Sequence, residues 1–261
     1  MKKTALFLTA AIALACAAEP VRLAPSSPED FTEGERLQMQ DGAFAVTKNG
    51  TFFTRVRVPI DSSKPGTLTA EYKLLPDATP AQFVIALDSV DAKGVRLLGA
   101  HLFGYKSTET VLAADAKKGQ RILKIKDADR WQKPAYRRGT MVAFYVKPDS
   151  SDLPNRSLSS LIASISPDGE VKLRYPLAAS YPAGTPVRIH RDTCSFGIGS
   201  VYVKGEEEWK TVTVKILPRR ENGDPQCWWP GIAKVGVRFG FVSSKPGAGL
   251  LIRNIVFTQE E

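Results

Sequence analysis

The chain has 261 residues, of which 43% are hydrophobic and 24% are charged, and its formal net charge is +9. No run of basic residues exceeds two, so the sequence lacks the polybasic segment typical of proteins that bind nucleic acids or anionic lipids. We therefore expect no nucleic-acid partner. The basic balance favours anionic ligands only mildly.

The first residues have the layout of an export signal. Lys2 and Lys3 precede an eleven-residue, largely apolar stretch at 5–15, and small residues follow it up to Ala18. A helix that spans a bilayer needs about 20 apolar residues, and no later stretch approaches that length. We expect residues 1–17 to be a signal peptide and the mature protein to be secreted, periplasmic or at the cell surface, with no transmembrane segment.

The three cysteines are interpreted separately. Around Cys16, Ala15-Cys16-Ala17 fits ordinary signal cleavage, whereas Ala13-Leu14-Ala15-Cys16 resembles an imperfect lipobox, which would make the protein a lipoprotein of the outer membrane. Cys194 and Cys227 remain in the mature chain, and in an oxidising compartment we expect them to form a disulfide. Closing that loop of about 34 residues would stabilise the fold by about 3 to 4 kcal/mol. The alternative is two buried free thiols.

The rest of the chain is predicted to be all-β. Residues 18–41 are rich in Pro, Ser, Ala and Glu without a clear period, which indicates an N-terminal arm or linker. Alternation with a period of two, typical of strands, then recurs at 67–74, 83–87, 142–146, 171–175, 212–216 and 235–241. Residues 250–258 are expected to form the last strand, which has apolar residues on both faces as a central strand would. A single short helical turn is expected near 158–164. Many short strands without intervening helices predict one antiparallel two-sheet β-sandwich, a jelly roll, over residues 42–261.

No catalytic motif is recognisable. The sequence contains no H-E-x-x-H, C-x-x-C or G-x-S-x-G, and His190 is expected to face solvent from a strand. We therefore expect a binding protein rather than an enzyme, although a pair of carboxylates could still act as in glycosidases. Asp88 and Asp91 flank a hairpin turn, and their oxygen atoms make them candidate ligands of a structural calcium ion.

Aromatic residues in two loop-like segments are the candidate ligand-binding residues. In the first segment Trp131 and Tyr136 are interleaved with Arg137 and Arg138, so rings for stacking lie beside guanidinium groups that bind carboxylate or sulfate. The second segment contains the adjacent indoles Trp228 and Trp229. In each segment the alternative is that the ring is part of the core. We expect at least one of these aromatic residues to be exposed.

Three segments resemble the jelly-roll carbohydrate-binding modules of exported bacterial glycan-degrading proteins, of the family four and nine type. They are FVIALDSVDAKGVRL at 83–97, EWKTVTVKI at 208–216 and GLLIRNIVF at 249–257, and the likeness covers 42–258. The resemblance implies a two-sheet sandwich that binds a ligand on a concave sheet face or at the loop end, often with a structural calcium. It also implies that Trp209 packs in the core.

These observations predict an exported, non-catalytic protein that binds a polysaccharide or other glycan, with an acidic one favoured by the positive charge. Two alternatives stay open. One is a glycoside hydrolase or polysaccharide lyase on a jelly-roll scaffold, and the other is a structural or adhesive domain of the cell surface.

Overall fold

The computed structural model describes residues 20–75, 81–133, 139–191, 197–203 (backbone only), 208–219, 226–245 and 247–259. Within these ranges the chain is all-β, as predicted, with short 3-10 helices between strands, and none of these helices has the length and hydropathy of a membrane-spanning segment. The elements are β1 (Val21–Leu23), η1 (Pro28–Asp30), η2 (Gly34–Arg36), β2 (Gln38–Gln40), β3 (Ala43–Val46), β4 (Gly50–Phe53), β5 (Val58–Pro59), β6 (Gly66–Leu74), β7 (Ala81–Val90), η4 (Gly99–His101), η5 (Lys106–Thr108), β8 (Thr110–Val111), β9 (Ile122–Lys124), η6 (Ala128–Trp131), β10 (Thr140–Phe144), β11 (Leu158–Ile165), β12 (Glu170–Leu173), β13 (Pro186–Arg191), β14 (Gly197–Val203), β15 (Lys210–Ile216), β16 (Lys234–Ser243) and β17 (Leu250–Gln259).

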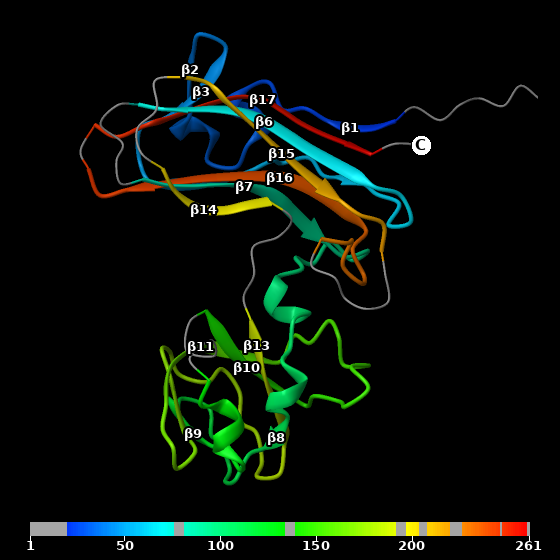
Figure 1. Ribbon diagram of the computed structural model, residues 1–261, viewed down its shortest axis with the longest axis vertical. Coiled ribbons are helices and arrows are strands. Elements are labelled where there is room, and N and C mark those ends of the chain that lie inside the picture. The colour runs from blue at the N-terminus through cyan, green and yellow to red at the C-terminus, as the bar shows by residue number, and fades with distance from the viewer. Residues whose placement is uncertain are drawn as a thin grey trace, which may run out of the picture.

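Two antiparallel sheets form a sandwich. The first has the order β15-β6-β17-β3-β2, with β1 paired to β17, and the second has the order β14-β7-β16-β4, with β5 paired to β16. Figure 1 shows these sheets as two layers, with the β7 and β16 layer nearer to the second part of the molecule. The predicted strands at 67–74, 83–87, 212–216, 235–241 and 250–258 are confirmed as β6, β7, β15, β16 and β17.

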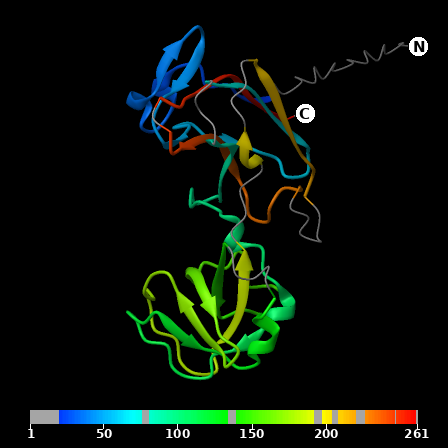
Figure 2. The same cartoon turned by 60° about the vertical axis from the view of Figure 1, so that its left-hand side comes forward.

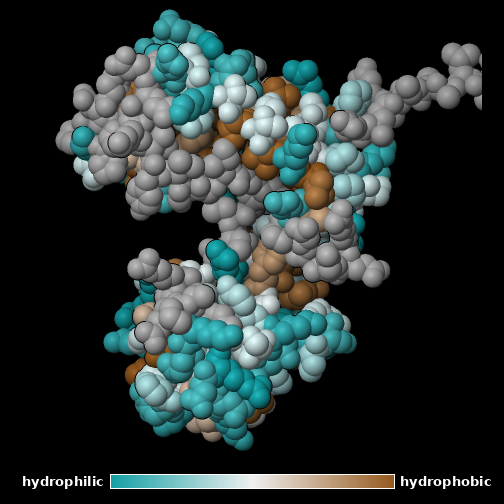
Figure 3. Space-filling view, viewed as in Figure 1, coloured by the Kyte–Doolittle hydropathy of each residue, from teal (hydrophilic) through white to brown (hydrophobic). Residues whose placement is uncertain are grey.

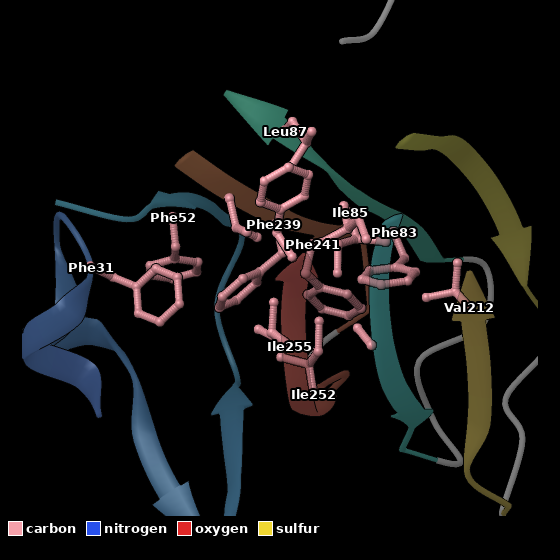
Figure 4. Close-up of a cluster of buried hydrophobic side chains, with 14 of the residues drawn as sticks. Phe31, Phe52, Phe83, Ile85, Leu87, Val212, Phe239, Phe241, Ile252 and Ile255 are labelled. Carbon is pink, nitrogen blue, oxygen red and sulfur yellow. The ribbon is translucent and has the colours of Figure 1, made fainter. Parts of the chain in front are cut away.

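The core of the sandwich lies between the sheets and is centred on phenylalanines. Phe239 on β16 contacts Phe31 and Phe52, with ring centroids 5.1 and 5.2 Å apart, and Figure 4 shows these rings pointing toward one another. In β16, Val235, Val237, Phe239 and Phe241 are all buried in this core. Alternation therefore directs the other residues of β16 to the outer face of the sheet.

The prediction of an N-terminal arm or linker is corrected. β1 pairs with the end of β17, beginning at Val21 opposite Gln259, and Phe31 is completely buried in the sandwich core. Leu37 is also buried there. Because this segment folds into 3-10 turns and very short strands, it has no sustained period that sequence analysis could detect, yet it is part of the sandwich.

Residues 110–133 and 139–191 form a separate antiparallel barrel. Its six strands have the order β8-β13-β10-β11-β12-β9, and the bridge between Leu112 and Ile125 joins the two ends of that order. The barrel has its own hydrophobic core, so the described chain has two main cores instead of the single one expected over 42–261. The helical turn expected near 158–164 is wrong, because these residues are in β11. The buried residues Ser159, Ile162 and Ile165 are three positions apart because the pairing of β11 contains register shifts, and this spacing resembles a helical period.

The barrel is inserted between β7 and β14, which are neighbours in the second sheet of the sandwich. Figures 1 and 2 show the barrel below the sandwich, and Figure 3 shows hydrophobic residues where the two parts meet. There Phe103 packs edge-on against Trp229 at 5.6 Å, and Arg156 from the barrel forms a salt bridge with Asp91 at 2.7 Å. The junction is therefore both apolar and ionic.

Candidate functional site

The outer face of the β4-β7-β16 sheet is the candidate site, and we call it the outer sheet face. On β16 the residues that point outward include Gly236, Arg238 and Gly240, because their neighbours are buried in the core. Cross-strand pairing places Phe53 of β4 opposite Arg238, and it places Val84 of β7 opposite Gly240. These residues come together only because three strands that are distant in sequence are adjacent in the sheet.

A hollow of about 110 Å³ lies on this face. Gly240 is at its centre, between Thr51 on β4 and Val84 on β7, and Arg238 and Val242 flank it along β16. A Cβ atom at position 240 would lie 3.0 Å from the hydroxyl oxygen of Thr51 and 3.3 Å from the Gly50 carbonyl oxygen, so a side chain at this position would crowd β4. The complete lining is Thr51, Gln82, Val84, Arg238, Gly240, Phe241 and Val242.

Arg238 has an unusual environment. Its Nε is buried and has no hydrogen-bond partner, and no carboxylate of the described residues lies within salt-bridge distance of its guanidinium. A buried donor that lacks an acceptor costs about 1 to 3 kcal/mol. The guanidinium carries five N–H donors in a planar fork that matches carboxylate or sulfate. β16 therefore holds the Arg238 guanidinium beside the hollow, although the unpaired Nε lowers the free energy of unfolding.

By contrast, two other arginines of this face are paired. Asp88 on β7 is buried and accepts from Arg57 Nη2 at 2.5 Å, and its second oxygen is 2.6 Å from Arg96 Nε. The Arg96 guanidinium also lies over the Phe53 ring, 4.5 Å from its centroid. One carboxylate thus faces two guanidinium groups, and the outer sheet face retains a positive charge.

The predicted calcium ligands do not fit a cation. Both oxygens of Asp88 face arginines, and Asp91 accepts from the backbone N–H groups of Lys93 and Val95 and from Arg156. These interactions, led by the Val95 N–H, hold the pKa of Asp91 below its ordinary value. No group of three or more His, Cys, Asp or Glu residues in the described part of the chain could hold a metal ion. Guanidinium groups therefore occupy the positions that calcium would need.

The tryptophans predicted to be on a binding surface are in the cores. Trp131 is 0% exposed in the barrel and donates from Nε1 to the Thr108 carbonyl at 2.7 Å. Trp228 is 1% exposed and Trp229 is 2% exposed, both in the sandwich core. None of these indoles can stack on a ligand, so the expectation of an exposed ring at these positions is corrected.

Several other predicted residues lie outside the described ranges. Tyr136, Arg137 and Arg138, together with Cys16 and Cys194, are among them. Cys227 is described and is a buried, free cysteine. The disulfide between Cys194 and Cys227, the lipidation of Cys16 and a ligand-binding role for the 136–138 segment therefore stay predictions.

His190 is completely buried in β13, so the expectation that it faces solvent is wrong. Its Nδ1 donates to the Ala100 carbonyl at 2.6 Å, and its Nε2 accepts from Arg188 Nε at 3.0 Å. Arg188 is also buried and forms salt bridges of 3.0 Å with Glu109 and Asp152. Burial lowers the pKa of His190 to about 4. This network joins the barrel to the connecting segment before it, so its role is structural.

Sequence reasoning missed Arg238, although a signal was present. In 234–242, KVGVRFGFV, the outward positions are occupied in turn by Lys, Gly, Arg, Gly and Val. Glycine is depleted in strands unless another group approaches the backbone closely. Here Thr54 and Arg57 approach Gly236 and Thr51 approaches Gly240, so the two glycines mark close packing on either side of Arg238.

Comparison of the chain with family models, with curated proteins and with solved structures found no match.

Proposed function

We propose that this protein is an exported, non-catalytic carbohydrate-binding protein and that it binds a glycan on the outer sheet face. The observation that carries the proposal is the hollow at Gly240, which combines apolar side chains with an arginine that has no partner in the described structure. Such a surface can contact the apolar face of a sugar ring through Val84 and Val242. It can donate hydrogen bonds to the polar rim of the ring through Arg238.

The size of the hollow supports a ligand that lies along the surface. At about 110 Å³ it is much smaller than the roughly 300–1,000 Å³ of pockets that enclose a whole small ligand. A polymer can place one substituent in the hollow while neighbouring units lie over the adjacent strands. A glycan chain has this form, whereas a free metabolite would be bound mainly by enclosure.

In this proposal the sandwich is a jelly roll. Support comes from the way successive strands change sheet: β3, β6, β15 and β17 belong to the first sheet, and β4, β7 and β16 belong to the second. The barrel has no counterpart in the resemblance on which the expectation was based, and it supplies a second surface. Export rests on the N-terminal signal pattern, and exposure to extracellular glycans follows from it.

A blocking substitution on the outer sheet face tests the proposal. Val242 lines the hollow and is 50% exposed, so Val242→Asp should fold normally while placing a charge on the rim of the hollow. Ile122→Asp is the matched control, because Ile122 is 52% exposed on a barrel strand. Affinity electrophoresis against neutral and acidic polysaccharides should show that Val242→Asp weakens retention at least tenfold, whereas the control migrates as the wild type does.

Three outcomes would overturn the proposal. The first is that no polysaccharide in the panel retains the wild type. The second is that Val242→Asp is retained as strongly as the wild type, which would place the ligand elsewhere. The third is that the wild type shortens a polysaccharide during incubation, which would identify an enzyme.

A further inference from the structure

We propose that Arg238 forms an anion subsite, which binds a carboxylate or sulfate substituent of the glycan in the hollow at Gly240. This inference rests on the proposed function and names the chemical class of its ligand. The subsite comprises the guanidinium of Arg238, the hollow that Gly240 lines and the polar side chains of Thr51 and Gln82.

The first argument is the pairing of arginines. Arg57 and Arg96 share Asp88 on the same face, Arg253 on the opposite sheet pairs with Glu71, and Arg188 in the barrel pairs with two carboxylates. Arg238 has no such partner among the residues that the structure describes, and its Nε has no acceptor. A guanidinium in the middle of a sheet therefore lacks the anion that these four arginines have. A ligand can supply it to the Nη groups, because among the Arg238 nitrogens only Nε is both buried and without a partner.

The second argument is charge. Asp88 is the sole acidic residue in β4, β7 and β16, and it already faces two guanidinium groups. An anion that approaches Arg238 consequently meets no uncompensated carboxylate on these strands. Nearby positive charge attracts anions and raises their local concentration.

The third argument is space. The hollow is too small for a whole sugar ring to be enclosed, but a carboxylate or sulfate group fits within about 110 Å³. Gly240 lines this hollow together with Arg238, which is two residues away on the same face of β16. Planar guanidinium groups bind carboxylate and sulfate with two parallel hydrogen bonds, so this geometry selects an acidic unit within a polymer.

The experiment compares three related polymers. A polyuronate, the same polymer after carboxyl reduction, and a sulfated polysaccharide are titrated into the wild type by isothermal titration calorimetry at 0.15 M salt. The variants are Arg238→Gln, which removes the charge, and Arg238→Lys, which keeps the charge and removes the planar fork. Lys215→Gln is the matched control, because Lys215 is exposed on β15 in the opposite sheet.

We expect the wild type to bind at least one anionic polymer at least tenfold more tightly than the reduced polymer. Arg238→Gln should remove that preference without changing the affinity for the reduced polymer, and Arg238→Lys should lose part of it. Lys215→Gln should retain the preference. If circular dichroism shows that Arg238→Gln does not fold, Arg238→Lys is the test of the subsite. The measured quantity is then the ratio of its affinities for the anionic and the reduced polymer, compared with the ratio for the wild type.

The failures are distinguishable. Equal binding of the acidic and reduced polymers by the wild type would overturn the anion subsite and leave the glycan-binding function standing. An anion preference that persists in both Arg238 variants would assign it to another group. Binding of none of the polymers would overturn the proposed function itself. Preference for the uronate or for the sulfated polymer identifies the anion.

Discussion

The stability of the barrel should depend on pH through His190. This residue is buried in β13 between the Arg188 guanidinium and the Ala100 carbonyl, and burial lowers its pKa from 6.5 to about 4. One pKa unit corresponds to about 1.4 kcal/mol, so the interval between these values corresponds to roughly 3 kcal/mol of stability.

The direction follows from proton binding. Above pH 6.5 the imidazole is neutral in both the folded and the unfolded barrel, and its contribution to stability is fully present. Between pH 6.5 and about 4 the unfolded chain binds a proton that the folded barrel does not, so the free energy of unfolding falls with falling pH. Below about 4 this contribution has been lost.

The contribution of His190 to the pH dependence must be distinguished from the contributions of titratable groups near it. His101 also has a lowered pKa, caused first by burial and then by the charge of Arg156. Its contribution to the free energy of unfolding therefore also falls with falling pH. Asp152 is ion-paired with Arg188 and has a lowered pKa, and its contribution is lost only below the range in which His190 titrates. Removing each histidine separately therefore resolves the two contributions.

The substitution is His190→Gln, with His101→Gln as the control. Glutamine can donate to the Ala100 carbonyl and accept from Arg188, and it does not titrate. Urea-dependent hydrogen–deuterium exchange, analysed on peptides from 140–190, measures the free energy of opening the barrel between pH 8 and pH 4. The wild type should lose roughly 3 kcal/mol more than His190→Gln over this range. Identical pH profiles for the two proteins would refute the reasoning.

Three further predictions concern the cores and the thiols. Trp131→Ala should destabilise the barrel by about 3 to 5 kcal/mol in urea unfolding, because the indole is fully buried, and a change below about 1 kcal/mol would contradict its place in the core. Asp88→Asn should destabilise the sandwich by about 1 to 3 kcal/mol, because it leaves Arg57 and Arg96 without a counterion and their partial exposure limits the effect. Unchanged stability would argue against these two salt bridges. Free-thiol titration of exported protein, denatured without reductant, should find no thiol if Cys194 and Cys227 are bridged, and two titratable thiols would disprove the bridge.

The sequence predicted strands correctly where one face of the strand is buried and the other is exposed to solvent. Alternation at 67–74, 212–216 and 235–241 predicted β6, β15 and β16 because side chains on a strand point to opposite faces in turn. It was uninformative at 18–41, where 3-10 turns bury Phe31 and Leu37 without a regular period. It was also misleading at 158–164, where register shifts place the buried residues Ser159, Ile162 and Ile165 three positions apart, so that β11 has no period of two.

For the candidate site, the sequence identified segments rich in aromatic residues, but it could not show whether the rings are buried or exposed. Trp131, Trp228 and Trp229 occur in polar, loop-like segments, yet each indole is buried. A polar neighbourhood in sequence does not determine exposure, because exposure depends on what packs against the residue in three dimensions.

The sequence by itself determined the all-β class and the position of most strands, because both follow from local alternation. Only the tertiary structure decided that the chain has two main cores and that β7 and β14 are neighbours despite the barrel inserted between them. It also decided which charges are paired: Asp88 meets Arg57 and Arg96, whereas Arg238, on the same face, has no partner in the described chain. Pairing across strands depends on sheet order and register, which are set by contacts between residues far apart in the sequence.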